Sequence, residues 1–269
     1  MTAGTDPRTG SDDTDDTDDT DDTAAPPRTV ALFASCIADL ASPGPAQATV
    51  QVLEAMGCEV LLPGQQTCCG QAALNSGYRQ EALRLMRHWI EVFDACDVVV
   101  SPSGSCVSTV HHHYPRVLDE PWRQRASEVV SRSYELSQFV AAYGRGLRLR
   151  LDAAVTYHDS CHMLRSMGEH TAPREVLARV EGLRLIELPN ADTCCGFGGT
   201  FATKFPDVSV AMGDQKLAEA AATGTHYLVS ADPGCLLHLA SRAEYADPRV
   251  RTRHIAEVLR DALPREARA

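Results

Sequence analysis

The 269-residue sequence has no apolar stretch that approaches the roughly 20 residues a helix needs to cross a bilayer. Its first residues also lack the basic and apolar regions of a secretory signal peptide. We therefore expect a cytoplasmic protein without a transmembrane segment. In a reducing compartment the ten cysteines are better candidates for metal ligands or catalytic groups than for disulfides.

Two further absences exclude common classes of partner. The sequence has no basic stripe of the kind that binds nucleic acid. It also has no G-x-G-x-x-G loop, although "CGFGG" superficially resembles part of one. We predict no nucleic-acid partner, and neither NAD nor flavin bound by this chain.

The acidic charge is concentrated at the N-terminus. Residues 1–27 contain nine Asp and one Arg, a balance of −8, which leaves only −3 of the formal net charge of −11 for the rest. A low-complexity run of like charges cannot bury apolar surface. We therefore interpret residues 1–27 as a disordered acidic tail, with a solubilising role favoured over partner binding.

A repeated motif divides the remainder into two halves. Residues 62–70 and 188–196 both read Leu-Pro, three variable residues, then Thr-Cys-Cys-Gly. Further cysteines match at offsets of 125 to 129 residues, so duplication explains the pattern and predicts domains at 28–150 and 151–269. The matched pairs are Cys36 with Cys161, Cys68 with Cys194, Cys69 with Cys195, and Cys106 with Cys235.

The segments between the cysteines follow one plan in both halves. Short apolar strands alternate with helices that begin near Pro and end near Gly, a pattern typical of α/β proteins with right-handed crossovers. We predict two pseudo-symmetric Rossmann-like lobes with parallel sheets, each carrying one cysteine-rich repeat. The predicted helices span 45–57, 77–95 and about 122–143 in the first half, and 173–182, 206–224 and about 250–262 in the second.

Each matched cysteine follows a predicted strand. Sites in open parallel sheets form outside the carboxyl ends of the strands, where helix N-termini also stabilise thiolates. The four thiols of each half are therefore expected to converge at one end of its sheet. The first set is Cys36, Cys68, Cys69 and Cys106, and the second is Cys161, Cys194, Cys195 and Cys235.

Four converging thiols favour an iron–sulfur cluster. Structural zinc sites usually use C-x₂₋₄-C pairs, and this sequence has no C-x-x-C. A cluster several ångströms across suits ligands spread over three loops, and glycines such as Gly70 and Gly196 let backbone N–H groups approach it. Inert buried cysteines are the alternative, which the paired repeats disfavour.

The repeat resembles the cysteine-rich CCG domain that is found in heterodisulfide reductase and in the iron–sulfur subunits of glycolate and glycerol-3-phosphate dehydrogenases. Those relatives often continue with C-x-x-C, but Ser103 and Asp232 stand where its first cysteine would be. A serine hydroxyl is a poor iron ligand, whereas the Asp232 carboxylate is able to bind iron or accept hydrogen bonds. One four-cysteine [4Fe–4S] cluster per half is therefore the expectation.

A closer resemblance is to the lactate-utilisation protein A family. It is carried by "CCGQAALNSGY", "PSGSC", "HDSCHMLR", "CCGFGGTF" and "ADPGC", and it covers about Val30 to Leu263. It implies an iron–sulfur oxidoreductase subunit that transfers electrons in a complex oxidising L-lactate to pyruvate. The expected partners are other subunits of that complex, both iron–sulfur and substrate-oxidising ones, and the electron acceptor stays open.

Other functions remain open at this stage. The chain resembles glycolate oxidase and heterodisulfide reductase subunits as well, so glycolate oxidation or thiol/disulfide exchange is an alternative. In thiol/disulfide exchange, the pairs Cys68–Cys69 and Cys194–Cys195 would alternate between the dithiol and the disulfide. A zinc-stabilised scaffold without redox activity is the third hypothesis.

A few residues outside the two sets are candidates for chemistry. His158 and His162 bracket Cys161, so either residue could tune a cluster or move a proton. Arg165 and Lys204 could hold a carboxylate near the second site, although a solvated surface role is favoured for both. His158, His162 and Arg165 are the catalytic candidates, with no firm assignment.

The remaining cysteines and a histidine run are interpreted as structural. Cys58 and Cys96 have no counterpart in the other half, and core packing is the favoured interpretation. The His111–His113 run resembles a metal tract, but its members would point in different directions on a helix, which favours a surface position.

Overall fold

The computed structural model describes residues 25–225, 227–246 and 249–268. Residues 1–24 of the predicted acidic tail lie outside the described residues. None of the helices within the described ranges combines the length and the apolar character that crossing a membrane requires.

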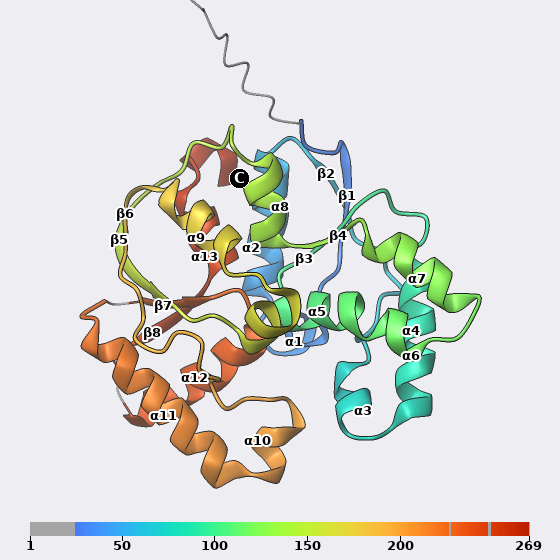
Figure 1. Ribbon diagram of the computed structural model, residues 1–269. Coiled ribbons are helices and arrows are strands. Elements are labelled where there is room, and N and C mark those ends of the chain that lie inside the picture. Colours follow the sequence, from blue (N-terminus) through green and yellow to red (C-terminus); the bar gives the residue numbers. More distant parts are fainter. Residues whose placement is uncertain (1–24, 226, 247–248, 269) are drawn as a thin grey trace, which may run out of the picture.

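The strands form two four-stranded parallel sheets of the same order (Figure 1). The first sheet is ordered β2-β1-β3-β4 and the second β6-β5-β7-β8, with every neighbouring pair parallel. The pseudo-symmetric α/β prediction is therefore confirmed. The strands are β1 (Thr29–Leu32), β2 (Glu59–Leu61), β3 (Val99–Ser101), β4 (Ser133–Glu135), β5 (Arg150–Tyr157), β6 (Glu181–Leu185), β7 (Tyr227–Ser230) and β8 (Arg251–His254).

Helices connect the parallel strands of each sheet. The first half contains α1 (Cys36–Leu40), α2 (Gly44–Ala55), α3 (Gln71–Asn75), α4 (Arg79–Phe93), α5 (Gly104–His112), α6 (Tyr114–Val117), α7 (Trp122–Val130) and α8 (Leu136–Tyr143). The second contains a π-helical turn η1 (His162–Met167), α9 (Thr171–Ala178), α10 (Thr200–Lys204), α11 (Pro206–Ala222), α12 (Pro233–Ala246), α13 (Ile255–Ala262) and a 3₁₀ turn η2 (Arg265–Arg268).

The predicted helices that close the two halves were wrong in one respect. A strand, β4, interrupts the predicted helix 122–143, and another, β8, occupies the start of the predicted helix 250–262. Each strand ends on a residue that caps the next helix, Glu135 for α8 and His254 for α13, and a capping residue requires extended backbone. Both strands were missed because their sequences, Ser-Tyr-Glu and Arg-Thr-Arg-His, are polar and lack the apolar residues that identified the other strands.

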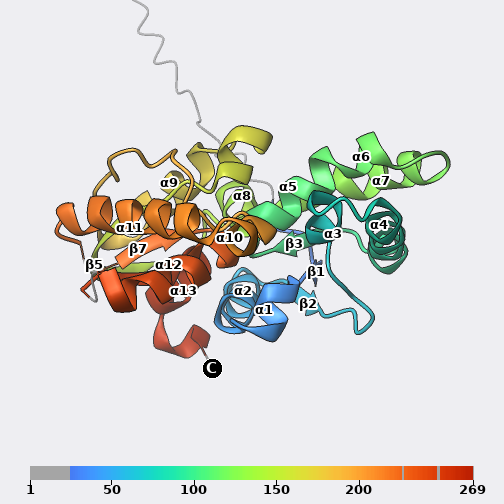
Figure 2. The ribbon, with the colours of Figure 1, turned by 90° about the horizontal axis from the view of Figure 1, so that it is seen from below.

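The two halves share one hydrophobic core. Val30 and Val52 of the first half and Val155, Val176 and Leu259 of the second are buried in the same cluster. Helix α2 packs against α13, and α8 packs against α9, so segments far apart in the sequence lie side by side (Figure 2). This packing holds the carboxyl ends of the two sheets together.

Candidate functional site

The eight matched cysteines lie at equivalent places in the two halves. Cys36 begins α1 just after β1, and Cys161 directly precedes η1 after β5. Cys106 and Cys235 lie in the first turns of α5 and α12. The adjacent pairs 68–69 and 194–195 lie in turns between a strand and a helix, at the same end of each sheet.

The glycine after each cysteine pair is required by the backbone. Gly70 has a φ of +86° and Gly196 a φ of +94°, in the left-handed region that disfavours other residues. A Cβ at Gly196 would lie 2.5 Å from the carbonyl oxygen of Ser209. The Gly70 N–H donates to Cys68 Sγ at 3.4 Å, and the Gly196 N–H donates to Cys194 Sγ at 3.4 Å. Each turn therefore directs a backbone donor at a sulfur.

The thiols of each set interact with one another. In the first set the Sγ atoms of Cys36 and Cys68 are 3.8 Å apart, and those of Cys69 and Cys106 are 3.5 Å apart. The hydrogen bond from Cys36 lowers the pKa of the Cys68 thiol to about 2. In the second set the hydrogen bond from Cys161 likewise lowers the pKa of the Cys194 thiol to about 2. One thiolate per set is thus stabilised before any metal is bound, as ligation requires.

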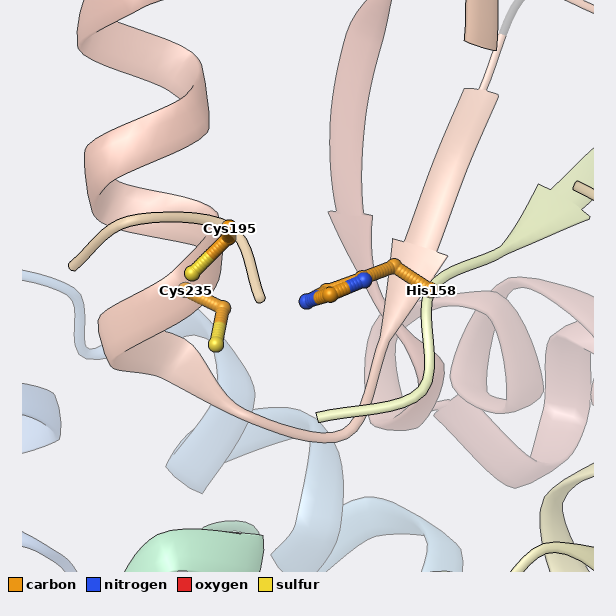
Figure 3. Close-up of side chains that lie close together, drawn as sticks. All are labelled: His158, Cys195 and Cys235. Atoms are coloured by element: carbon orange, nitrogen blue, oxygen red, sulfur yellow. The ribbon is translucent and has the colours of Figure 1, made fainter. Parts of the chain in front are cut away.

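His158 adjoins the second set. Its ring points toward Cys195 and Cys235 (Figure 3), and the possible ligand atoms of these three residues lie within 4.8 Å of one another. The side chain is fully buried, and neither ring nitrogen has a hydrogen-bond partner in the described part of the chain. Burial lowers the pKa of His158 to about 4, so the imidazole is neutral at neutral pH.

Both cysteine sets line one cavity. All eight matched cysteines border a single pocket of about 190 Å³ between the halves. Gln71, His162, Ser105 and Asp232 also line it. The sequence predicted convergence within each half, but it contained no sign that the two sites face each other.

Hydrogen bonds across this cavity tie the halves together. The Gly104 N–H donates to the carbonyl oxygen of Ala231 at 3.0 Å, and the Ser105 N–H donates to Asp232 Oδ2 at 2.7 Å. Gln71 Nε2 and His162 Nε2 are 3.0 Å apart. Gln71 and Ser105 were missed as site residues, although their places beside Gly70 and Cys106 could have suggested them.

Asp232 and Ser103 differ in what they contact. Asp232 Oδ1 accepts from the backbone N–H groups of Gly234 and Cys235 at 3.0 and 3.2 Å, so the carboxylate caps α12. Ser103 makes no such cap for α5, and its Oγ lies 3.5 Å from that of Ser105. Asp232 therefore accepts hydrogen bonds at the edge of the site, one of the two roles considered for it.

Of the remaining candidates, one lines the cavity and the others are exposed outside it. His162 is half-buried and lines the cavity. Arg165 is exposed and donates from Nη2 to the carbonyl oxygen of Asp192 at 3.0 Å. Lys204 is exposed at the end of α10. Neither cation lines the cavity, in keeping with the favoured surface role.

The two cysteines without a counterpart pack against hydrophobic cores, and the histidine run lies at the end of α5. Cys58 is buried in the core shared by the halves, and Cys96 packs against the core of the first half. His111, His112 and His113, the run for which a surface position was predicted, are all half-buried. A ring nitrogen of His111 lies 2.8 Å from the carbonyl oxygen of Ser133 at the start of β4, the strand that the sequence did not predict.

The donor set fits an iron–sulfur cluster better than a four-thiolate zinc ion. With Zn–S bonds of about 2.3 Å, four tetrahedral thiolates would all lie about 3.8 Å from one another. Within the described part of the chain, the group of ligand atoms within 4.8 Å comprises His158, Cys195 and Cys235 rather than either cysteine set. Although pairs of sulfurs within the first set are 3.5 to 3.8 Å apart, neither set surrounds one point as four zinc ligands would, and backbone N–H groups directed at sulfur are a feature of iron–sulfur sites.

Comparison with solved structures supports the fold alone. A hypothetical protein from Helicobacter pylori superposes with a TM-score of 0.62 at 11% sequence identity, over 88% of this chain. This chain spans about half, 49%, of that protein's length. At such an identity the likeness extends to the architecture and no further.

Comparison with known sequences identifies the family. The cysteine-rich domain family (CCG) matches residues 30–111 and 155–240. Lactate utilization protein A of Halalkalibacterium halodurans is 46% identical over 86% of this chain and 96% of the relative. That of Bacillus cytotoxicus is 44% identical over 86% of this chain and 98% of the relative. The chain therefore belongs to the lactate utilization protein A family and carries two cysteine-rich CCG domains.

Proposed function

We propose that the protein is an iron–sulfur electron-transfer subunit of a complex that oxidises L-lactate to pyruvate. Cys36, Cys68, Cys69 and Cys106 would hold one [4Fe–4S] cluster, and Cys161, Cys194, Cys195 and Cys235 would hold the other. The clusters, when bound, supply one-electron redox chemistry. The observation that carries the proposal is the convergence of all eight cysteines on one cavity, in a chain whose relatives are named for lactate utilisation.

The residues around the cavity support the assignment of electron transfer, rather than lactate binding, to this chain. Apart from the cysteines, its polar side chains include Gln71, Ser105, His162 and Asp232, and among the described residues no Arg or Lys lines it. A lactate carboxylate therefore finds no cationic partner there. We accordingly assign lactate binding to partner subunits and electron transfer to this chain. The halves 28–150 and 151–269 would each form one cluster-binding domain.

Backbone groups in the walls of the cavity stabilise the thiolate form that cluster ligation requires. Backbone N–H groups at Gly70, Gly196 and Phe197 donate to Sγ atoms at 3.4 to 3.5 Å, and such bonds stabilise negative charge on sulfur. The closeness of the two sets supports passage of electrons from one centre to the other. Hydrogen bonds across the cavity, such as that from the Ser105 N–H to Asp232, hold the two centres at a fixed distance and orientation.

The test is anaerobic purification of the chain, alone and with the proteins that bind it, followed by addition of substrate. We expect a brown protein that contains iron and inorganic sulfide. L-lactate should bleach the visible absorption of the purified complex but not that of the chain alone. Glycolate, a heterodisulfide and D-lactate serve as parallel additions.

Each other outcome identifies an alternative. Bleaching by glycolate in place of L-lactate would assign the chain to a glycolate oxidase. Reduction coupled to a heterodisulfide would favour the thiol/disulfide oxidoreductase. A colourless protein loaded with zinc would reject electron transfer and leave a metal-stabilised scaffold.

A further inference from the structure

The fully buried imidazole of His158 is not accounted for by the fold. It follows β5, and its backbone N–H donates to the carbonyl oxygen of Val229 at 2.8 Å, which satisfies the main chain of this residue. Within residues 25–225, 227–246 and 249–268, neither nitrogen of the side chain has a hydrogen-bond partner. A buried polar group without a partner is costly, and native proteins rarely retain one without a reason.

The surroundings of the ring indicate what it would bind. Cys195 Sγ, Cys235 Sγ and a ring nitrogen of His158 lie within 4.8 Å of one another, and the ring points at the two sulfurs (Figure 3). An imidazole nitrogen together with two cysteine sulfurs is a donor combination that binds metals in proteins.

The first half provides an internal comparison. Three residues before the first ligand of each set stand Phe33, before Cys36, and His158, before Cys161. Phe33 is buried against Trp89 and Phe93, with ring centroids 5.6 and 5.5 Å apart. An aromatic hydrocarbon side chain therefore suffices for the fold at this position, and the imidazole is needed for something else.

We propose that His158 is a further metal ligand in the C-terminal centre, bound through a ring nitrogen beside Cys195 and Cys235. This inference rests on the proposed function, because it concerns the cluster assigned to the second cysteine set. The N-terminal centre has no equivalent, so the two clusters differ in ligation. The ligands of a cluster help to set its reduction potential, so a histidine ligand in one centre only gives the duplicated centres a means to differ.

The test is pulsed electron paramagnetic resonance on the reduced full-length protein, prepared with histidine of natural abundance or labelled with nitrogen-15. We expect a strong nitrogen coupling that changes with the label. It should persist in Cys69→Ser, which removes one ligand, and that of the first centre only. This measurement needs no change at His158, so a folding defect cannot explain its outcome.

Two variants assign the signal. His158→Phe copies the first half and should abolish the coupling while the iron of the first centre stays bound. His162→Gln is the matched control, because His162 is the other histidine beside Cys161, and the coupling should survive there. Circular dichroism confirms that each variant is folded.

The failures of the two proposals are distinguishable. Iron in both centres without a strong nitrogen coupling, or with a coupling that survives His158→Phe, would overturn the ligand assignment and leave the proposed function intact. Zinc in place of iron would reject the proposed function. X-ray absorption would then decide the assignment, since a nitrogen ligand about 2.0–2.1 Å from zinc, lost in His158→Phe, would uphold it and sulfur ligands alone would refute it. A metal-free protein would overturn both.

Discussion

The two halves build the same site on the same scaffold but surround it differently. Both place a cysteine after the first strand, a Cys-Cys-Gly turn after the second and a cysteine in a helix after the third. Beside the first site, Phe33 belongs to an aromatic cluster with Trp89 and Phe93. Beside the second, the ring nitrogens of His158 have no hydrogen-bond partner among the described residues. The two halves thus keep the thiols at the same positions, but the adjoining side chain is a packing residue, Phe33, in the first half and a proposed ligand, His158, in the second.

The capping residues of the closing helices show the same divergence. Glu135 caps α8 and His254 caps α13, each within a capping box and each almost inaccessible to solvent. Burial raises the pKa of Glu135 to about 8 and lowers that of His254 to about 4. An acid and a base therefore perform the same structural task, both largely uncharged at neutral pH. The cap position selects for a hydrogen-bond acceptor rather than for charge.

The comparison between Phe33 and His158 predicts the largest effect. Phe33→Ala should lower the free energy of unfolding of the metal-free protein by about 3–5 kcal/mol, because it opens a cavity in a packed aromatic cluster. His158→Phe should change it far less, since the loss of two unpartnered nitrogens offsets any misfit of the ring. Urea denaturation followed by circular dichroism measures both. Equal destabilisation by the two changes would mean that His158 is a packing residue as well.

The comparison between Glu135 and His254 predicts opposite pH dependences. A raised carboxyl pKa means that the native state retains a proton which the unfolded state loses above its ordinary pKa near 4.5. Glu135 should therefore reduce stability by roughly 3 kcal/mol as the pH rises from about 5 to about 8, and Glu135→Gln should remove that fall. Urea denaturation of the metal-free protein across this range measures the difference.

His254 supplies the matched control. Because its pKa is lowered from 6.5 to about 4, the unfolded state takes up the proton first, and stability should fall as the pH drops from 6.5 toward 4. His254→Asn should flatten that lower range and leave the upper range unchanged. If Glu135→Gln flattened the lower range instead, the opposing chemistry of the two caps would be refuted.

Asp232 and Ser103 should differ by a smaller amount. Asp232→Ala removes three backbone hydrogen bonds, two at the start of α12 and one from Ser105 across the cavity, so we expect a loss of about 2–3 kcal/mol. Ser103→Ala should cost less than about 1 kcal/mol, because no helix cap depends on its hydroxyl. Thermal and urea denaturation compare the two. A larger effect at Ser103 would contradict the contacts described.

The smallest effects are expected at the two cysteines without a counterpart. Cys58→Ala and Cys96→Ala should each cost at most about 1 kcal/mol and leave the metal content unchanged, because both side chains pack against apolar cores. Metal analysis beside denaturation checks both claims. Loss of iron from either variant would place that cysteine among the ligands.

Much of the fold could be predicted because the cysteines mark the chain at regular places. Matching Cys36, Cys68 and Cys106 to their partners aligned the halves, and hydrophobic segments between them predicted β1, β3 and the long helices α4 and α11. The short strands β4 and β8 could not be predicted, because polar capping residues occupy them and their pairing to β3 and β7 is tertiary.

The candidate site was only partly predictable. Cysteine spacing indicated convergence within each half, since all parallel strands of a sheet end at one edge. The shared cavity depends on how α2 and α13 pack in the common core, and apolar contact surfaces carry no motif. Gln71 and Ser105 were missed although they adjoin Gly70 and Cys106, and His158 could not be separated from His162 before their surroundings were known.

Iron and sulfide analysis of the anaerobically purified protein and of two matched variants tests the central claim most directly. With one [4Fe–4S] cluster per half, the wild type should contain about eight irons per chain. Cys69→Ser and Cys195→Ser should each retain about four, because each change removes a ligand of one set only. Complete loss of iron from either variant would show that the centres are not independent. One zinc ion per half in place of iron would contradict the account.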